Sequence, residues 1–238
     1  MASTAERRRA FAKDCARVID EFGLDGIDID WEYPTRSDAG ISSSPEDTDN
    51  FTLLVREIRS VIGPDKLLTI ATPCTGQHFD FPAIIDCLDF VNVMAYDMQN
   101  GPDNFHCALY RSPNAGAVTA EEAVVNHIKA GVPARKLVMG MSFYGRGIPE
   151  LRKYGNYRDL PSIIGDKYRK MWDAEACGPY LVDDEGHFVF GYDDPRSLEL
   201  KCRYILDRGL LGGMYWDYHG DNEAGDLSHT VSRELLGR

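Results

Sequence analysis

The sequence lacks any long apolar run. None of its stretches approaches the ~18 consecutive apolar residues that a membrane-spanning helix needs. The longest candidates, such as Leu67–Ala71, have the length of a single buried strand. We therefore expect no membrane span.

Positive charge is also scarce. The 238 residues include 26 Lys and Arg against 38 Asp and Glu, which gives a net charge of −12 at pH 7. A phosphate backbone would be repelled by that charge, so nucleic acid is a poor candidate partner. A neutral ligand fits the composition better.

Metal-binding patterns are absent as well. The six cysteines form no C-x-x-C pair, and the six histidines form no H-x-x-x-H pattern. Structural zinc sites need such paired ligands, and disulfide frameworks belong to shorter, cysteine-denser chains. The sequence predicts no metal and no cofactor, and most cysteines are interpreted as small buried hydrophobes.

The first residues do not resemble a secretory leader, which would carry an apolar stretch of roughly 7–15 residues. Ser3 and Glu6 instead form an S-x-x-E capping box, followed by Phe11, Cys15 and Val18 at helical spacing. We expect either a cytoplasmic protein or one whose natural N-terminus lies upstream, and the chain itself leaves the localisation open.

Strands alternate with helices along the chain. Helices are expected after Ser3, over 44–62, 120–130 and 195–208, and a hairpin is expected over Tyr180–Phe190. This alternation predicts an α/β fold with a parallel sheet, and either a doubly wound sheet or a (β/α) barrel satisfies it. The expected parallel strands are Gly26–Trp31, Leu67–Thr72, Phe90–Met94, Leu137–Ser142 and Gly212–Trp216.

Two further helix starts are indicated by capping residues. Ser44 is expected to cap the second helix, with Pro45 at its first position and Asp47 in its first turn. Thr119 and Glu122 form another capping box ahead of the third helix.

The first strand carries a row of acids. Asp28, Asp30 and Glu32 alternate with apolar residues, so they share one face at a spacing of ~6.5–7 Å. One interpretation is an edge strand with a solvated acidic face. A calcium site is another, although a straight strand wraps a cation poorly. Strands of parallel sheets are usually apolar on both faces, which favours a chemical purpose for these acids.

The chemical purpose that we infer for these acids is the binding and release of a proton. Carboxylates this close together do not all ionise readily, so at least one pKa is expected to rise and one proton to be shared. An acid kept protonated near neutral pH serves as a general acid. Glu32 stands last in the row, at the carboxyl end of the strand, where α/β barrels place their chemistry, and is therefore the candidate acid.

At this point the sequence resembles a known family. Residues 25–32 resemble the D-G-x-D-x-D-x-E signature of family 18 glycoside hydrolases, the chitinases. Three later segments resemble further family motifs in the same order: 90–97 (M-x-Y-D), 140–146 (G-x-x-F-Y-G-R) and 212–216, the final strand with its tryptophan. The resemblance spans nearly the whole chain.

The resemblance implies roles for individual residues. Glu32 would protonate the glycosidic oxygen, Asp30 would hold the substrate's 2-acetamido group, and Asp28 would share a proton with Asp30. Tyr96 would hydrogen-bond the acetamido carbonyl, whose oxygen attacks the anomeric carbon, so the anomeric configuration is retained without a separate nucleophile. The further positions implied to bind substrate are Asp97, Met94, Trp216, Tyr144, Arg146 and Tyr33.

The implied partner is chitin or an N-acetylglucosamine oligosaccharide. Two alternatives stay open: a non-catalytic sugar-binding relative, and an enzyme of the same family that acts on N-glycans or peptidoglycan. By the same resemblance, secretion is expected.

The family's catalytic domain is a (β/α)8 TIM barrel with its acidic signature on the fourth strand. The five expected strands would be its fourth to eighth, so we predict an N-terminally truncated barrel over 1–238, the C-terminal part of a longer protein. Residues 148–193 would form a short α+β insertion before the last strand. A barrel without three strands has open edges, so we expect this chain to be unstable or to oligomerise.

Overall fold

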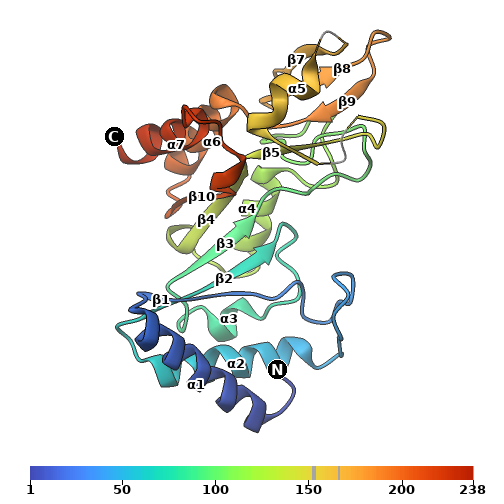
Figure 1. Ribbon diagram of the computed structural model, residues 1–238. Helices are drawn as coiled ribbons and strands as arrows, with labels where there is room; N and C mark the ends of the chain where they lie inside the picture. The colour runs from blue at the N-terminus through green and yellow to red at the C-terminus, as the bar shows by residue number, and fades with distance from the viewer. Residues whose placement is uncertain (152–153, 166, 238) are drawn as a thin grey trace. The chain divides into compact units, whose positions relative to one another are not determined.

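The computed structural model describes residues 1–151, 154–165 and 167–237, and they form two compact units. Unit 1 comprises residues 1–93 and 126–137, and unit 2 comprises residues 94–125 and 138–238. The colours of Figure 1 follow the chain through both units. In the described part of the chain, no helix is long and apolar enough to cross a membrane.

Unit 1 is built on three neighbouring strands. β1 (Gly26–Asp30) runs parallel to β2 (Leu67–Pro73), and β2 also neighbours β3 (Phe90–Met94), which ends at the first residue of unit 2. Its helices are α1 (Ala5–Phe22), α2 (Asp47–Ile62) and the short α3 (Phe81–Ile84). The expected strands are confirmed, with β1 ending one residue early.

The core of unit 1 follows from apolar periodicity. Phe51, Leu54 and Ile58 recur at helical spacing on α2 and are buried, while α1 packs along α2. β2 is buried along nearly its whole length, as a parallel strand between two layers should be. Gly23 ends α1 in the left-handed conformation, a backbone state that glycine adopts without steric cost.

Two predicted helix caps are wrong. Thr4, not Ser3, caps α1, because its hydroxyl oxygen accepts the Arg7 N–H at 3.2 Å. α2 begins at Asp47 rather than just after Ser44, because the Ser44 N–H and hydroxyl both donate to the Asp47 carboxylate. Ser44 therefore orders the loop that leads into α2.

In unit 2, two further strands of the α/β pattern pair in parallel. β4 (Leu137–Ser142) pairs with β10 (Gly212–Trp216), with Gly213 opposite Met139. Thr119 and Glu122 form the expected reciprocal capping box at the start of α4 (Ala120–Lys129), the helix whose last residues belong to unit 1. α6 (Pro195–Asp207) packs against α7 (Asp226–Leu236).

A second sheet in unit 2 is antiparallel. Its strands lie in the order β6 (Gly155–Asn156), β5 (Tyr144–Gly147), β9 (Phe188–Gly191), β8 (Gly178–Val182) and β7 (Arg169–Asp173), with α5 (Leu160–Ile164) packed against it. The hairpin expected over 180–190 is confirmed as β8 and β9. β7 was not predicted, because its first residues are exposed and polar and give no alternation.

A buried ion pair ties α6 to β4. Lys201 Nζ of α6 lies 2.5 Å from Asp193 Oδ2, and both side chains are 1% exposed. The hydroxyls of Ser142 and Ser197 donate to the same carboxylate at 3.0 and 2.7 Å. The carboxylate therefore replaces its lost hydration with three donors.

We expect Lys201→Met to destabilise the chain strongly, by ~3–5 kcal/mol, because it leaves the Asp193 charge buried without its cation. Urea unfolding followed by circular dichroism measures the loss. The matched control is Glu199→Gln, which breaks the exposed Glu199–Arg233 pair and should cost no more than ~1 kcal/mol. Equal losses in the two variants would contradict the assignment.

Candidate functional site

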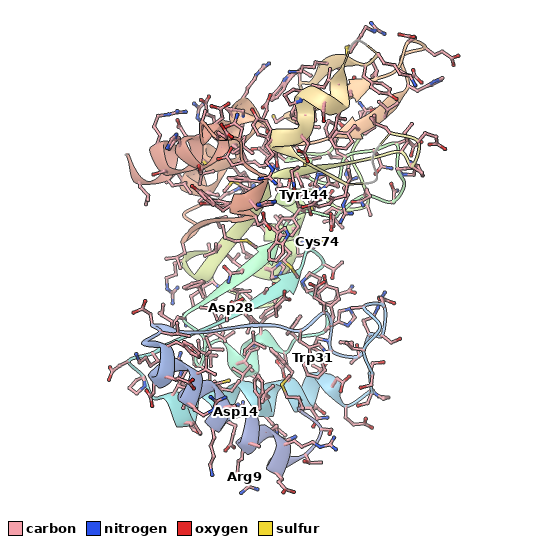
Figure 2. All side chains as sticks on the ribbon, viewed as in Figure 1. Arg9, Asp14, Asp28, Trp31, Cys74 and Tyr144 are labelled. Carbon is pink, nitrogen blue, oxygen red and sulfur yellow. The ribbon has the colours of Figure 1, made fainter. Side chains whose placement is uncertain are left out.

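Asp28 and Asp30 lie on one face of β1 as expected, and Glu32 follows two residues beyond the end of the strand. Asp28 and Asp30 are exposed, whereas Ile29 between them is buried. Trp31 points the other way, with its ring edge-on to Phe51 of α2 at 5.9 Å; Figure 2 labels Asp28 and Trp31. The apolar face thus anchors the strand, and the acids stay free of that packing.

Asp28 is held by the neighbouring strands. Its Oδ1 accepts a hydrogen bond of 2.5 Å from the Thr69 hydroxyl of β2 and one of 3.0 Å from the Asn92 side-chain amide of β3. Asp28 is therefore a fixed acceptor on β1, the edge strand of the sheet.

Asp30 differs from Asp28 in its protonation. Desolvation, followed by the charges of Glu32 and Asp28, raises the pKa of Asp30 from 3.8 to about 6. Protonation removes the Asp30 charge and with it the repulsion from Glu32 and Asp28. Asp30 can exchange a proton near neutral pH.

Glu32 follows the end of β1, beside a pocket of about 530 Å³ in unit 1. Asp30, Trp31 and Glu32 line it from one side, and the 39–42 loop and the first two residues of the chain line the rest. The Tyr33 ring stacks on His78 at 6.4 Å, and burial together with the neighbouring Glu32 charge raises the pKa of the Tyr33 hydroxyl.

In unit 2 the predicted residues gather around Asp97, which follows Tyr96 after the end of β3. Tyr144 donates its hydroxyl hydrogen to Asp97 Oδ1 at 2.7 Å. Arg146 forms a two-pronged contact, with Nε to Oδ1 at 2.8 Å and Nη2 to Oδ2 at 2.5 Å. The Asp97 backbone is left-handed, with φ of 55°, an uncommon state for a residue other than glycine.

These donors decide the charge of Asp97. Burial alone would raise the pKa of Asp97, but hydrogen bonds from His106, Arg146 and Tyr144 outweigh it and hold that pKa well below its usual range. Burial and the Asp97 charge in turn raise the pKa of Tyr144. Asp97 is therefore a permanent anion, and Tyr144 a permanent donor, at neutral pH.

Aromatic rings surround this cluster. Tyr154 stacks on Tyr144 at 4.7 Å, and Tyr96 meets Tyr144 edge-on at 6.1 Å. Trp216, at the end of β10, is 55% exposed, whereas Met94 is nearly buried. Exposed aromatic faces of this kind suit the C–H groups of a neutral sugar ring.

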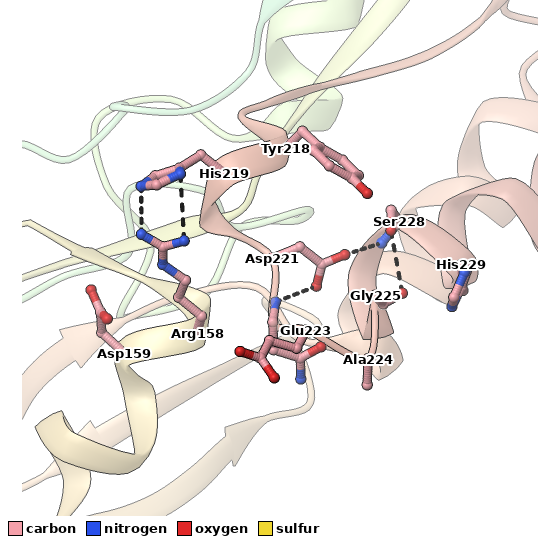
Figure 3. A pocket seen from close by; sticks show the side chains of 11 residues that line it. Arg158, Asp159, Tyr218, His219, Asp221, Glu223, Ala224, Gly225, Ser228 and His229 are labelled. Carbon is pink, nitrogen blue, oxygen red and sulfur yellow. Dashed lines mark hydrogen bonds between the residues drawn. The ribbon is translucent and has the colours of Figure 1, made fainter.

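A metal centre and a second pocket are the other sites to consider. Among the described residues, no group of three or more His, Cys, Asp or Glu could hold a metal ion. A larger pocket of about 880 Å³ in unit 2, shown in Figure 3, is lined by Arg158, Tyr218 and His219 and by the start of α7. Its Asp221 carboxylate is occupied in accepting backbone N–H groups of α7, and none of the sequence-predicted residues line it.

Sequence reasoning missed three polar contacts of these clusters. Asn92 had a signal, as the one polar residue within Phe90–Met94, and Thr69 a weaker one among the apolar residues of β2. His106 had none, because it lies in an irregular segment that only the folded chain brings to Asp97.

Comparison with known proteins agrees with this geometry. Residues 1–221 match the family model "Glycosyl hydrolases family 18". The chain belongs to glycosyl hydrolase family 18. Its motifs at 25–32 and 90–97 thus belong to the family that the sequence indicated.

Two curated relatives and one solved structure illustrate this family membership. The chain is 32% identical to "Chitinase A1" of Niallia circulans over 93% of this chain and 38% of that protein. It is 30% identical to "Chitinase 1" of Aphanocladium album over 99% of this chain and 61% of that protein. The chain therefore spans less than two thirds of the length of both curated relatives. A family 18 N-acetylglucosaminidase from Paenibacillus barengoltzii superposes with a TM-score of 0.89 at 32% identity, over 98% of this chain and 77% of that one.

The family likeness also identifies the fold. The parallel pairs β1–β2 and β4–β10, with helices following the strands, are the α/β elements of a family 18 TIM barrel. Neither unit contains a closed barrel within its described residues.

We expect one aspartate of the purified chain to titrate near pH 6 in carbon-detected NMR, and Asp30→Asn to remove that transition. Glu32→Gln should lower the Asp30 pKa more than Asp28→Asn does, because the Glu32 charge contributes more.

The folded state holds the Asp30 proton more tightly than the unfolded state, so the stability of the folded chain should fall as pH rises from about 4 to about 6. Asp65→Asn, an exposed change elsewhere in unit 1, is the control, and an unchanged transition in Glu32→Gln contradicts the assignment.

Proposed function

We propose that the protein is a retaining glycoside hydrolase that cleaves β-1,4-linked N-acetylglucosamine polymers with the help of the substrate's own acetamido group. The observation that carries the proposal is the pair Asp28 and Asp30 on one face of β1, with Glu32 just beyond its end and with the pKa of Asp30 raised to about 6.

The three acids divide the work by their surroundings. Glu32, beside the pocket and beyond the end of the strand, donates the proton to the glycosidic oxygen. Asp30 accepts the N–H of the 2-acetamido group, which orients the carbonyl oxygen toward the anomeric carbon. Asp28, fixed by Thr69 and Asn92, stays available to take up the proton that Asp30 exchanges.

Charge balance explains why no second carboxylate attacks the sugar. As the bond to the leaving oxygen breaks, positive charge develops on the anomeric carbon, and the acetamido oxygen forms a bond to it. A negative Asp30 stabilises the resulting oxazolinium ring. Water then opens that ring from the side the leaving group vacated, with Glu32 as the base, so the configuration is retained.

We assign substrate-binding roles to the unit 2 residues from the family motif. Tyr96 hydrogen-bonds the acetamido carbonyl, and the Asp97 anion with Arg146 and Tyr144 recognises polar groups of the sugar. The exposed Trp216 ring supports the apolar face of a sugar. Met94 and Tyr33 complete the proposed set, with Met94 contributing mainly to packing.

Chitin is the proposed substrate because the relatives named above are a chitinase from Niallia circulans and one from Aphanocladium album. Chitin is a polymer too large to cross a membrane, so we propose that the protein acts outside the cytoplasm.

The test is hydrolysis of chitotetraose by the purified chain and by Glu32→Gln, followed by NMR of the new anomeric ends. We expect the β-anomer to form first and Glu32→Gln to lower kcat by roughly 10²–10⁴-fold, the contribution of general acid catalysis. The control, Glu57→Gln at a half-buried position of α2 outside the pocket, should retain wild-type turnover.

Equal turnover by the wild type and Glu32→Gln would overturn the acid assignment. Binding of the oligosaccharide without any turnover would favour a sugar-binding relative over an enzyme. Release of sugar from N-glycans or peptidoglycan but not from chitotetraose would overturn the substrate assignment alone.

A further inference from the structure

His106 is a fully buried imidazole in the segment that joins β3 to α4. Its own backbone is fixed, because its carbonyl accepts the Met98 N–H at 3.0 Å and Phe105 pairs with Ala115. The side chain is 0% exposed, so it meets no bulk solvent. Neither the motifs nor the family resemblance gave this residue a role.

One ring nitrogen of His106 faces Asp97. Nδ1 accepts the Asp97 backbone N–H at 3.4 Å when the imidazole is neutral, and it lies 3.6 Å from Asp97 Oδ1, to which it donates when protonated. The ring also lies beside the Tyr144 ring, with 5.0 Å between centroids. His106 thus contacts the backbone and the carboxylate of Asp97, together with the tyrosine that donates to that carboxylate.

The other ring nitrogen has no hydrogen-bond partner among the described residues. A buried polar atom without a partner costs stability, and a phenyl ring would fill similar space without that cost. Packing alone therefore does not explain a histidine at this position. The contact between its other ring nitrogen and Asp97 explains it.

We propose that His106 is a positioning residue, which fixes the orientation and the negative charge of Asp97 from behind, so that Asp97, Tyr144 and Arg146 meet the substrate as one rigid set. This inference rests on the substrate-binding role proposed above for Asp97. Donors from β5 and from the segment that contains His106 then hold a carboxylate whose backbone is in the uncommon left-handed state.

Electrostatics supports this geometry. Burial by itself would lower the pKa of His106, but the neighbouring Cys107 and Asp97 outweigh it and raise the pKa to about 9. The groups that face the imidazole are Asp97, Cys107 and the Tyr144 ring, and Arg146 also contacts the Asp97 carboxylate. A protonated His106 donates to the Asp97 carboxylate, and this pairing is lost as pH rises through about 9.

Three substitutions separate positioning from packing. His106→Asn places its amide near the position of Nδ1, His106→Gln places its amide near that of Nε2, and His106→Phe keeps the ring shape without a nitrogen. We expect kcat on chitotetraose to fall roughly tenfold or more in the Gln and Phe variants, with little change in KM, because a misplaced substrate-positioning residue lowers the rate. His106→Asn should recover most of the loss.

A second readout does not depend on turnover. Carbon-detected NMR follows the Asp97 carboxyl, whose pKa should rise in the Phe and Gln variants and rise least in the Asn variant. His187→Phe, a change at an exposed histidine of the β8–β9 turn, is the matched control and should alter neither readout.

Two results overturn the proposal. One is a Phe variant with wild-type kcat and an unchanged Asp97 titration. The other is equal damage in the Asn and Gln variants, which would assign His106 to packing. If the wild-type chain does not hydrolyse chitotetraose while the Asp97 titration still responds as expected, the proposed hydrolysis fails and the positioning of Asp97 by His106 remains.

Discussion

The two-residue repeat of extended backbone in β1 is the constraint on which unit 1 depends. Burial of Ile29 and the packing of Trp31 on Phe51 fix one face of the strand against the helices, so Asp28 and Asp30 must emerge on the other. Parallel pairing with β2 then brings Thr69 opposite Asp28. The acidic row is thus a consequence of core packing, and a shift of register by one residue would bury the acids and expose the apolar residues.

Like residues acquire unlike chemistry from their neighbours. Asp30 stands among carboxylates and is pushed toward its neutral form, whereas Asp97 stands among three donors and is held ionised. Catalysis by proton exchange needs a group of the first kind, which changes charge near neutral pH. Recognition of a neutral sugar needs one of the second kind, which keeps its charge and its orientation. The same side chain serves both purposes because its surroundings, not its type, set the balance between desolvation and hydrogen bonding.

Sequence reasoning reached the elements whose signals are local. Alternation placed Asp28 and Asp30 on one face of β1, and the Thr119–Glu122 box marked the start of α4. It failed where the deciding partner lies far along the chain. Asp47 accepts donors from Thr35 and Ser44, so the loop before α2 is organised by a residue inside the helix. β7 shows no apolar alternation of its own and forms because β8 supplies its hydrogen bonds.

Two buried groups of unit 2, Asp193 and His106, differ in how completely their polar atoms are hydrogen-bonded, and this difference separates a structural role from a functional one. Asp193 is surrounded by Lys201, Ser142 and Ser197, all of its partners are internal, and the group needs nothing from a ligand. His106 is as deeply buried, yet one of its nitrogens has no partner and the other faces a half-exposed carboxylate. A fully satisfied network is explained by the fold that it stabilises. An incompletely satisfied one costs stability, and chains retain such a cost mainly where a site requires it. By this reasoning Lys201 belongs to the scaffold, and His106 belongs with Asp97.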